Sequence, residues 1–277
     1  MKHFTDQGSK YFRIPFGWKY IQPQLFSDLN DTFFQQFDLL VQKALSNGAI
    51  VVIDVHNYAR INGGIIGQGG PTNDAFADLW QRLASKYAQT ANIIFGVMNE
   101  PHELDLTQWA VSVQAALKAI RDAGAKSQLV LLPGSDYSSI NDFNATFSAL
   151  GNITDYDGSN TRLIFDIHSY LDFDNSGTNA ECIHNNVDTL MNVKDILTQY
   201  SRQAFLSETG GGNVDSCVKL MSDQMAFVTS NSDQFLGWVA WAAGSFSTDY
   251  VLSLTPFPDG SDQILWTKSL KSYLYST

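Results

Sequence analysis

The chain has 277 residues, 44% of them hydrophobic, and a formal net charge of −11. A chain of this size can bury a full core, and no linker, low-complexity tract or internal repeat divides it, so we expect one barrel-sized domain over residues 1–277. The acidic balance excludes a nucleic-acid or anionic-membrane binder, because those partners require clustered Lys and Arg. A neutral or poorly soluble substrate is more compatible with this negative charge than a polyanion is.

The targeting signals are few. No run approaches 18 consecutive apolar residues, and the first 20 residues lack the order of a signal peptide, so we expect a soluble chain from which any signal has been removed. Glycosylation sequons at Asn30, Asn144 and Asn152 favour a secreted glycoprotein. Cys182 and Cys217 could be an isolated reduced pair or one disulfide.

Apolar strands alternate with amphipathic helices along the whole chain. Strands are predicted at 11–16, 49–55, 93–98, 128–134, 163–170, 203–208 and 235–244, and helices at 31–47, 73–89, 105–124, 186–200, 215–230 and 262–274. Residues 1–10 resemble the end of a helix, residues 60–73 a glycine-rich binding loop, and the segment from 134 to about 160 an irregular connection. This alternation predicts an α/β protein, a (β/α)8 barrel that lacks its first strand, because a closed barrel of this type needs eight.

Two strands end abruptly in glutamate. The run IIFGVM at 93–98 is followed by Asn99 and Glu100, and the run beginning at 203 ends in Glu208. Catalytic residues of parallel α/β folds stand at the carboxyl ends of strands, so a pair of carboxylates converging on one bond is expected. Such a pair hydrolyses acetals, retaining configuration at a separation of about 5 to 5.5 Å and inverting it at about 6.5 to 9.5 Å.

Further polar and aromatic residues mark the other strand ends. Arg13 would keep one glutamate ionised, and Asn99 could donate a hydrogen bond to a sugar 2-hydroxyl. The remaining candidates could bind hydroxyls, orient Glu100 or stack on a sugar face; they are His56, His168, Tyr170 and Trp241.

The sequence gives less support for a metal site or for another nucleophile. Each histidine taken alone is more often structural than catalytic, and a metal site built from Glu100, His56, His102 and His168 would draw on separate strands without ligand spacing. No G-x-S-x-G elbow or Cys-His signature offers another nucleophile. We therefore expect no metal and no cofactor.

Several motifs resemble the secreted fungal endo-β-1,4-glucanases of glycoside hydrolase family 5. They are NEPH at 99–102, IDVHNYARINGG at 53–64, FDIHSY at 165–170, SETGGGN at 207–213 and GWVAWAAGSF at 237–246. The resemblance implies a (β/α)8 barrel, retention of configuration, no cofactor and a β-glucan polysaccharide as substrate. It also implies Glu100 as acid/base and Glu208 as nucleophile, a Cys182 to Cys217 disulfide, and a site completed by Arg13, His56, Asn99, His168, Tyr170 and Trp241.

The chain departs from the family at its front, where members have a strand before the opening helix, and it shows no cellulose-binding module. Two alternatives stay open: a mannanase or mixed-linkage glucanase of the same clan, which the 60–73 loop would discriminate, and a catalytically silent carbohydrate-binding barrel, which activity on a chromogenic β-glucoside would exclude. We expect a monomer with no nucleic-acid or membrane partner.

Overall fold

The computed structural model describes residues 1–244, 246–247 and 249–274. Its contacts divide the chain into two compact units, which we describe separately. Unit 1 comprises Met1–Lys2 and Tyr11–Asp166, and unit 2 comprises His3–Lys10 and the residues from Ile167 onward. Among the described residues, no helix combines the length and the apolar character needed to cross a membrane. The single domain expected over residues 1–277 stays a prediction.

The strands of unit 1 follow the sequence prediction closely. They are β1 (Tyr11–Phe16), β2 (Ile50–Val55), β5 (Ile93–Gly96), β6 (Leu129–Pro133) and the first half of β7 (Leu163–Tyr170), adjacent in that order. Each pair is parallel, with Tyr11 opposite Ile50 and Val51 opposite Ile93. Residues 51–55 and all of β5 are buried, as expected for strands covered on both faces.

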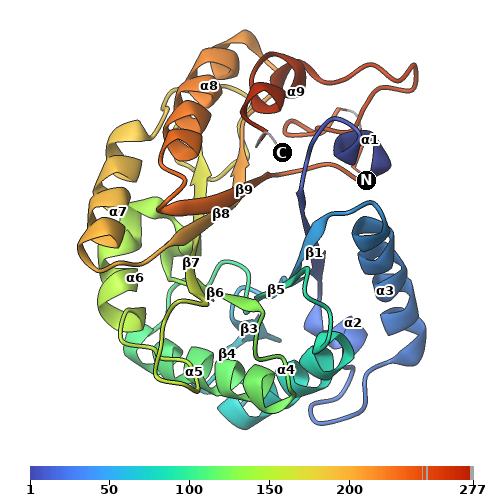
Figure 1. Ribbon diagram of the computed structural model, residues 1–277, viewed down its shortest axis with the longest axis vertical. Helices are drawn as coiled ribbons and strands as arrows, with labels where there is room; N and C mark the ends of the chain where they lie inside the picture. The colour runs from blue at the N-terminus through green and yellow to red at the C-terminus, as the bar shows by residue number, and fades with distance from the viewer. Residues whose placement is uncertain (245, 248, 275–277) are drawn as a thin grey trace. The chain divides into compact units, whose positions relative to one another are not determined.

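The long helices of unit 1 begin at side-chain caps. They are α3 (Asp31–Ser46), α4 (Asn73–Tyr87) and α5 (Leu106–Asp122), and the caps Asn30, Thr72 and Asp105 accept hydrogen bonds from backbone N–H groups of the first turn. The helix predicted from residue 105 thus begins one residue later, with Asp105 as its cap. Helices α4 and α5 lie side by side on the outside of the strands of this unit (Figure 1).

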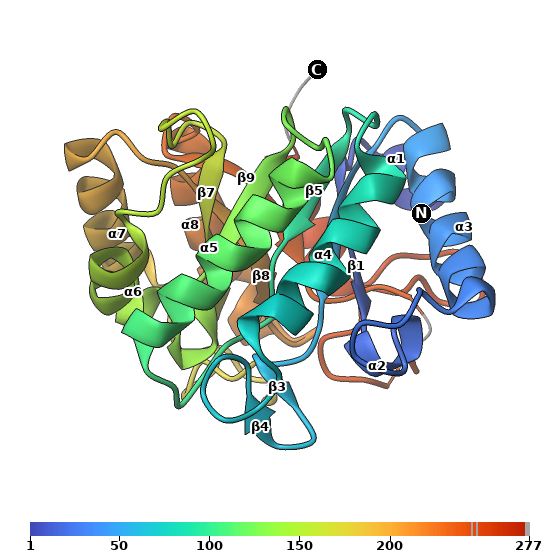
Figure 2. The same ribbon diagram turned by 90° about the horizontal axis from the view of Figure 1, so that it is seen from below.

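Unit 1 also contains elements that the sequence analysis missed. The glycine-rich loop holds a small hairpin, β3 (Arg60–Ile61) and β4 (Gly64–Ile65), which Figure 2 shows beyond the lower end of α4. The short helix α2 (Trp18–Ile21) was also missed. The helix end expected within residues 1–10 is confirmed as α1 (Lys2–Thr5), of which only Lys2 belongs to unit 1. The irregular segment predicted after residue 134 is wrong, because two 3-10 turns, Asp136–Ser138 and Ile140–Asp142, lead into α6 (Phe143–Leu150). This helix buries Phe143, Thr146 and Leu150, a stripe that polar neighbours obscure in the sequence.

Unit 2 contains the second half of β7, β8 (Ala204–Gly210) and β9 (Phe235–Ala240), adjacent in that order. Its helices are α7 (Val187–Gln199), α8 (Asp215–Ser230), α9 (Ile264–Lys268) and the 3-10 turn η3 (Leu270–Tyr273). The predicted helix over 262–274 is thus interrupted, at Ser269, whose φ of −128° and ψ of −75° are not helical. The predicted strand over 235–244 ends early because Ala242 pairs with Leu252 and Leu254 instead.

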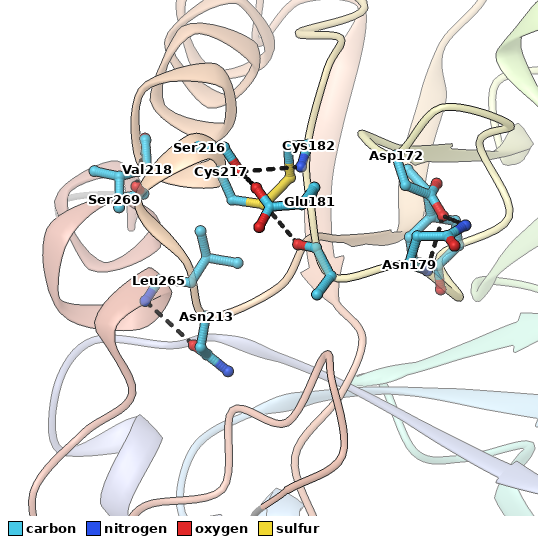
Figure 3. The surroundings of a disulfide bond; sticks show 12 residues. Asp172, Asn179, Glu181, Cys182, Asn213, Ser216, Cys217, Val218, Leu265 and Ser269 are labelled. Atoms are coloured by element: carbon cyan, nitrogen blue, oxygen red, sulfur yellow. Dashed lines mark hydrogen bonds between the residues drawn. A yellow bond between two sulfur atoms is a disulfide. The ribbon is translucent and has the colours of Figure 1, made fainter.

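A disulfide joins Cys182 to Cys217 at the start of α8, with the two Cα atoms 4.8 Å apart (Figure 3). The pairing implied by the family resemblance is confirmed. In the chain-entropy description, a bridge across a separation of 35 residues stabilises the fold by about 4 kcal/mol. Space around the bridge is tight, since a Cβ added at Gly211 would lie 2.6 Å from the Cys182 sulfur and one added at Gly212 would lie 2.1 Å from the Ala180 carbonyl oxygen.

A second tie in unit 2 is the loop closed by Asp172, also drawn in Figure 3. The buried Asp172 carboxylate accepts hydrogen bonds from the backbone N–H groups of Gly177, Thr178 and Asn179 and from the Asn179 side chain. The Ser176 hydroxyl donates to the same carboxylate at 3.2 Å. Five donors therefore hold one carboxylate and fix the turn of the chain between β7 and the disulfide.

Candidate active site

Three of the predicted site residues meet in unit 1. They are Arg13 within β1, His56 directly after β2 and Asn99 in the segment after β5. The Arg13 guanidinium donates a hydrogen bond from Nη2 to Asn99 Oδ1 at 2.5 Å. The amide nitrogen of Asn99 lies 3.2 Å from His56 Nε2. Asn99 is completely buried, and its backbone N–H donates to the Val55 carbonyl at 2.8 Å, which anchors the chain beyond β5 to β2.

A fourth residue, Asp54, closes these three into a ring. Its Oδ1 lies 3.2 Å from Arg13 Nη2 and its Oδ2 lies 2.8 Å from His56 Nδ1, and the residue is 1% exposed. Sequence reasoning left Asp54 out of the site. The signal was present, because residues two apart on a strand point to the same side, and Asp54 precedes His56 by two.

Glu100 follows Asn99 directly but lies in a different environment. Asn99 is buried whereas Glu100 is partly exposed, and Glu100 adopts a left-handed backbone with φ of 46°. For a residue with a side chain this conformation costs about 1 to 3 kcal/mol and is concentrated at functional sites. The turn coincides with the change from a fully buried amide, which joins the ring, to a partly exposed glutamate.

The residues after Glu100 form an aromatic surface in unit 1. The His102 ring stacks on Tyr137 with centroids 4.4 Å apart, and Tyr58 approaches the same imidazole edge-on at 6.3 Å. Both tyrosines are about 40% exposed or more. His102, weighed above only as a metal ligand, is thus engaged by rings on both sides.

In unit 2 the structure brings together three more predicted residues, on β7 and β8. The Tyr170 hydroxyl donates to Glu208 Oε2 at 2.6 Å, and His168 Nδ1 lies 3.6 Å from the same oxygen. His168 Nε2 also lies 3.0 Å from the Ser207 hydroxyl. Glu208 is only 4% exposed, so a buried carboxylate is held by a hydroxyl and an imidazole from the neighbouring strand.

Behind Glu208 lies a buried polar network that the sequence analysis did not anticipate. The Gln224 amide of α8 accepts from the Ser169 hydroxyl at 2.6 Å and donates to the Thr209 hydroxyl at 2.7 Å. Thr209 in turn donates to the Ser169 carbonyl at 2.7 Å. The network ties β7 to β8 next to Glu208, and a fully buried glutamine in an apolar helix stripe is the one sequence feature that hints at it.

Trp241 lies just past β9, in the loop that the strand prediction had included. Its indole N–H donates to the Tyr250 hydroxyl at 3.2 Å, and Phe246 packs against it with ring centroids 5.9 Å apart at 65°. Residue 245, within the GWVAWAAGSF motif, lies outside the described residues. Trp241 stays partly exposed, as a stacking surface for a sugar requires.

The sequence was compared with known proteins. It matches the family model for cellulase, glycosyl hydrolase family 5, over residues 1–244. It is 50% identical over 272 residues to endoglucanase EG-II of Hypocrea jecorina, covering 96% of this chain and 64% of that protein. It is 47% identical over 277 residues to the manganese dependent endoglucanase Eg5A of Phanerodontia chrysosporium, covering 98% of this chain and 72% of that one. The chain thus spans less than two thirds of the length of EG-II.

The structural comparison agrees. The crystal structure of Cel5A (EG2) from Hypocrea jecorina superimposes with a TM-score of 0.95 at 49% identity, over 97% of this chain and 84% of that one. With the seven-stranded main sheet of the described residues, this likeness confirms the predicted (β/α) barrel class. The chain belongs to the cellulase family, glycosyl hydrolase family 5.

Proposed function

We propose that this protein hydrolyses internal β-1,4-glucosidic bonds of cellulose and related β-glucans with retention of configuration. The observation that carries the proposal is the buried Glu208 carboxylate, held by Tyr170 and His168 in a chain of this family. Glu208 is the nucleophile, and Glu100, on the loop after β5, is the acid/base. Both carboxylates follow apolar runs at which the sequence turns abruptly polar, Glu208 within the last three residues of β8 and Glu100 beyond the end of β5.

The chemistry balances in two displacements. A carboxylate oxygen of Glu208 bonds to the anomeric carbon while the bond to the glycosidic oxygen breaks, and Glu100 gives its proton to that oxygen. Glu100 then removes a proton from water, whose oxygen attacks the same carbon and releases Glu208. The Tyr170 hydrogen bond limits the rotation of the Glu208 side chain, which favours a near-attack geometry.

The other predicted residues support this pair. Asn99, fixed by Arg13 and His56, donates to the sugar 2-hydroxyl; His168 binds next to Glu208; and Trp241 stacks on a sugar face. The substrate is a β-glucan polysaccharide, as the names of the endoglucanase relatives suggest for those proteins. The protein works as a secreted monomer without a cofactor.

The test is hydrolysis of soluble carboxymethyl-cellulose by wild type, Glu100→Gln and Glu208→Gln, with circular dichroism on each sample. Both variants should stay folded and lose several orders of magnitude in rate, because each removes one half of the acid and nucleophile pair. The matched control is Glu103→Gln, an exposed glutamate three residues from Glu100 that should keep its activity. Near-normal turnover in either site variant would refute the assignment.

Three further readouts separate the alternatives. Product stereochemistry by NMR should show retention, and azide should partly rescue Glu208→Ala with inverted product, because an external nucleophile occupies the open face. Faster cleavage of mannan or mixed-linkage glucan would favour those activities, and a folded but inactive wild type would favour a binding role. Since one relative is named manganese dependent, rates with added Mn²⁺ and with EDTA should be equal if no cofactor is used.

A further inference from the structure

The ring of four residues in unit 1 includes a buried carboxylate that the proposed mechanism does not use. We propose that Asp54 is a positioning residue, which fixes the tautomer of His56 and thereby the orientation of the Asn99 amide. The inference rests on the proposed function for its kinetic consequence, but its structural part stands on the ring alone.

The direction of each hydrogen bond follows from what each group can do. An ionised carboxylate only accepts, so the proton between Asp54 and His56 belongs to His56 Nδ1. In a neutral imidazole the other nitrogen, Nε2, is then an acceptor, and two donors lie within reach of it, the Asn99 amide nitrogen at 3.2 Å and the Tyr58 hydroxyl at 3.3 Å. An acceptor at Nε2 excludes the amide oxygen of Asn99 from the position that faces it, so Asp54 favours the orientation in which Asn99 turns its NH₂ group towards His56.

The contact with Arg13 independently requires the same orientation of the Asn99 amide. A guanidinium has donors only, so Arg13 Nη2 requires an acceptor, and Asn99 presents Oδ1 to it at 2.5 Å. An amide flip would set NH₂ against guanidinium and oxygen against the Nε2 lone pair at once. The side-chain orientation of Asn99 is thus fixed by two independent contacts, and Asp54 touches the partner in each.

The orientation matters because Asn99 adjoins Glu100. An amide nitrogen carries two hydrogens, and His56 takes one of them, so the second is the donor that Asn99 can offer to a sugar hydroxyl. Hydrogen bonds to the 2-hydroxyl strengthen in the transition state of glycoside hydrolysis. Loss of the orientation should therefore lower kcat more than it raises KM.

A simpler role for Asp54 is to neutralise the buried Arg13. That role predicts loss of stability when Asp54 is changed, but no particular tautomer of His56. The same unit offers a control, a buried carboxylate that contacts no histidine in the hydrogen bonds and ion pairs of the described residues. Asp155 makes two hydrogen bonds to Arg121 and also pairs with Arg162, far along the chain from the ring. Asp155→Asn removes a buried negative charge without touching His56.

The decisive measurement is ¹⁵N NMR of the His56 ring in the intact chain, assigned with a His56→Gln variant. Wild type should show the Nδ1–H tautomer, which free histidine does not favour, and Asp54→Ala should shift it towards Nε2–H or a mixture. Asp155→Asn should leave the His56 signals unchanged. A wild-type ring in the Nε2–H form would overturn the proposal without any variant having to fold.

Kinetics on carboxymethyl-cellulose provide a second test of the role of Asp54. Asp54→Ala should lower kcat about 10- to 100-fold, a range typical for residues that orient an active group, with KM changed less than about threefold. The isosteric Asp54→Asn retains one acceptor for His56 and should lose less, so partial rescue is expected. Unchanged kcat in a folded Asp54→Ala, or unchanged His56 signals, would refute the role. If wild type fails to cleave glucan, the proposed function fails while the tautomer measurement still decides the positioning.

Discussion

The strand ends of the two units hold their polar side chains in different ways. In unit 1, Arg13 and Asp54 are both charged and buried, and they are stabilised by each other and by the neighbours in their ring. In unit 2, the carboxylate of Glu208 is held by the Tyr170 hydroxyl with the His168 imidazole beside it, and the support behind it consists of neutral groups on Gln224 and its partners.

The same contrast recurs away from the site. Unit 1 buries a second ion pair, in which the Arg121 guanidinium makes two hydrogen bonds to Asp155 at 2.8 and 2.9 Å. Unit 2 relies on a disulfide and on the Asp172 loop. A buried charge needs its partner in direct contact, so ionic support is local and costly to break. Neutral hydrogen bonds can form a series through the core, so a side chain on a helix can stabilise the site without contacting it directly.

The largest expected effect comes from breaking the ionic support of unit 1. Arg121→Met should lower the free energy of unfolding by about 3 to 5 kcal/mol, because it leaves the buried Asp155 without its main partner. Urea unfolding followed by circular dichroism measures the loss. The double variant Arg121→Met with Asp155→Leu should recover most of it, and a double variant as unstable as the single one would contradict the ionic explanation.

An intermediate effect is expected from the neutral network of unit 2. Gln224→Met conserves volume but leaves the Ser169 and Thr209 hydroxyls with fewer hydrogen-bond partners. The free energy of unfolding should therefore fall by about 1 to 3 kcal/mol. The rate on carboxymethyl-cellulose should also fall several-fold, because β7 and β8 carry Tyr170 and Glu208. The exposed Gln199→Met serves as the control. Full activity together with lost stability would show that the network supports the fold alone.

The smallest effect concerns the Asp172 loop and its dependence on pH. Burial by itself would raise the pKa of Asp172, but hydrogen bonds from Asn179, Gly177 and Ser176 outweigh it, and the pKa is lowered. The unfolded chain therefore binds the proton more readily. The stability from this group is present above the unfolded pKa of about 3.9 and is lost as pH falls through the folded value.

Thermal unfolding of wild type and Asp172→Asn between pH 6 and pH 2 tests this sign. Wild type should be the more stable at pH 6, and the difference in Tm should shrink as the pH falls below about 4. A difference that stays constant across this range would mean that the carboxylate charge is not what the five donors stabilise.

The sequence predicted most of the fold because its buried strands are nearly continuous apolar runs. β1 and β7 have the predicted bounds, whereas α6 was missed because its buried stripe is short and interleaved with polar residues. Glu100 and Glu208 stood out because a polar residue at the end of an apolar run is conspicuous. The residues alone left the Cys182 to Cys217 pairing open, and only the family resemblance implied it.

The residues that hold the site were not predictable in the same way. Asp54, Ser207 and Gln224 act through partners on other elements, and a single sequence carries no record of which strands become neighbours. Spacing of two along β2 could have linked Asp54 to His56, because strand geometry is local. No local rule links Gln224 to Thr209 across a helix and a strand.

The glycines at 210–212, shortly after Glu208, bear on any attempt to engineer this protein. A run of three glycines is commonly treated as a flexible hinge and offered for randomisation. Here any side chain at 211 would collide with the bridge sulfurs and any side chain at 212 with the backbone of residue 180. A saturation library should therefore recover glycine alone at both positions.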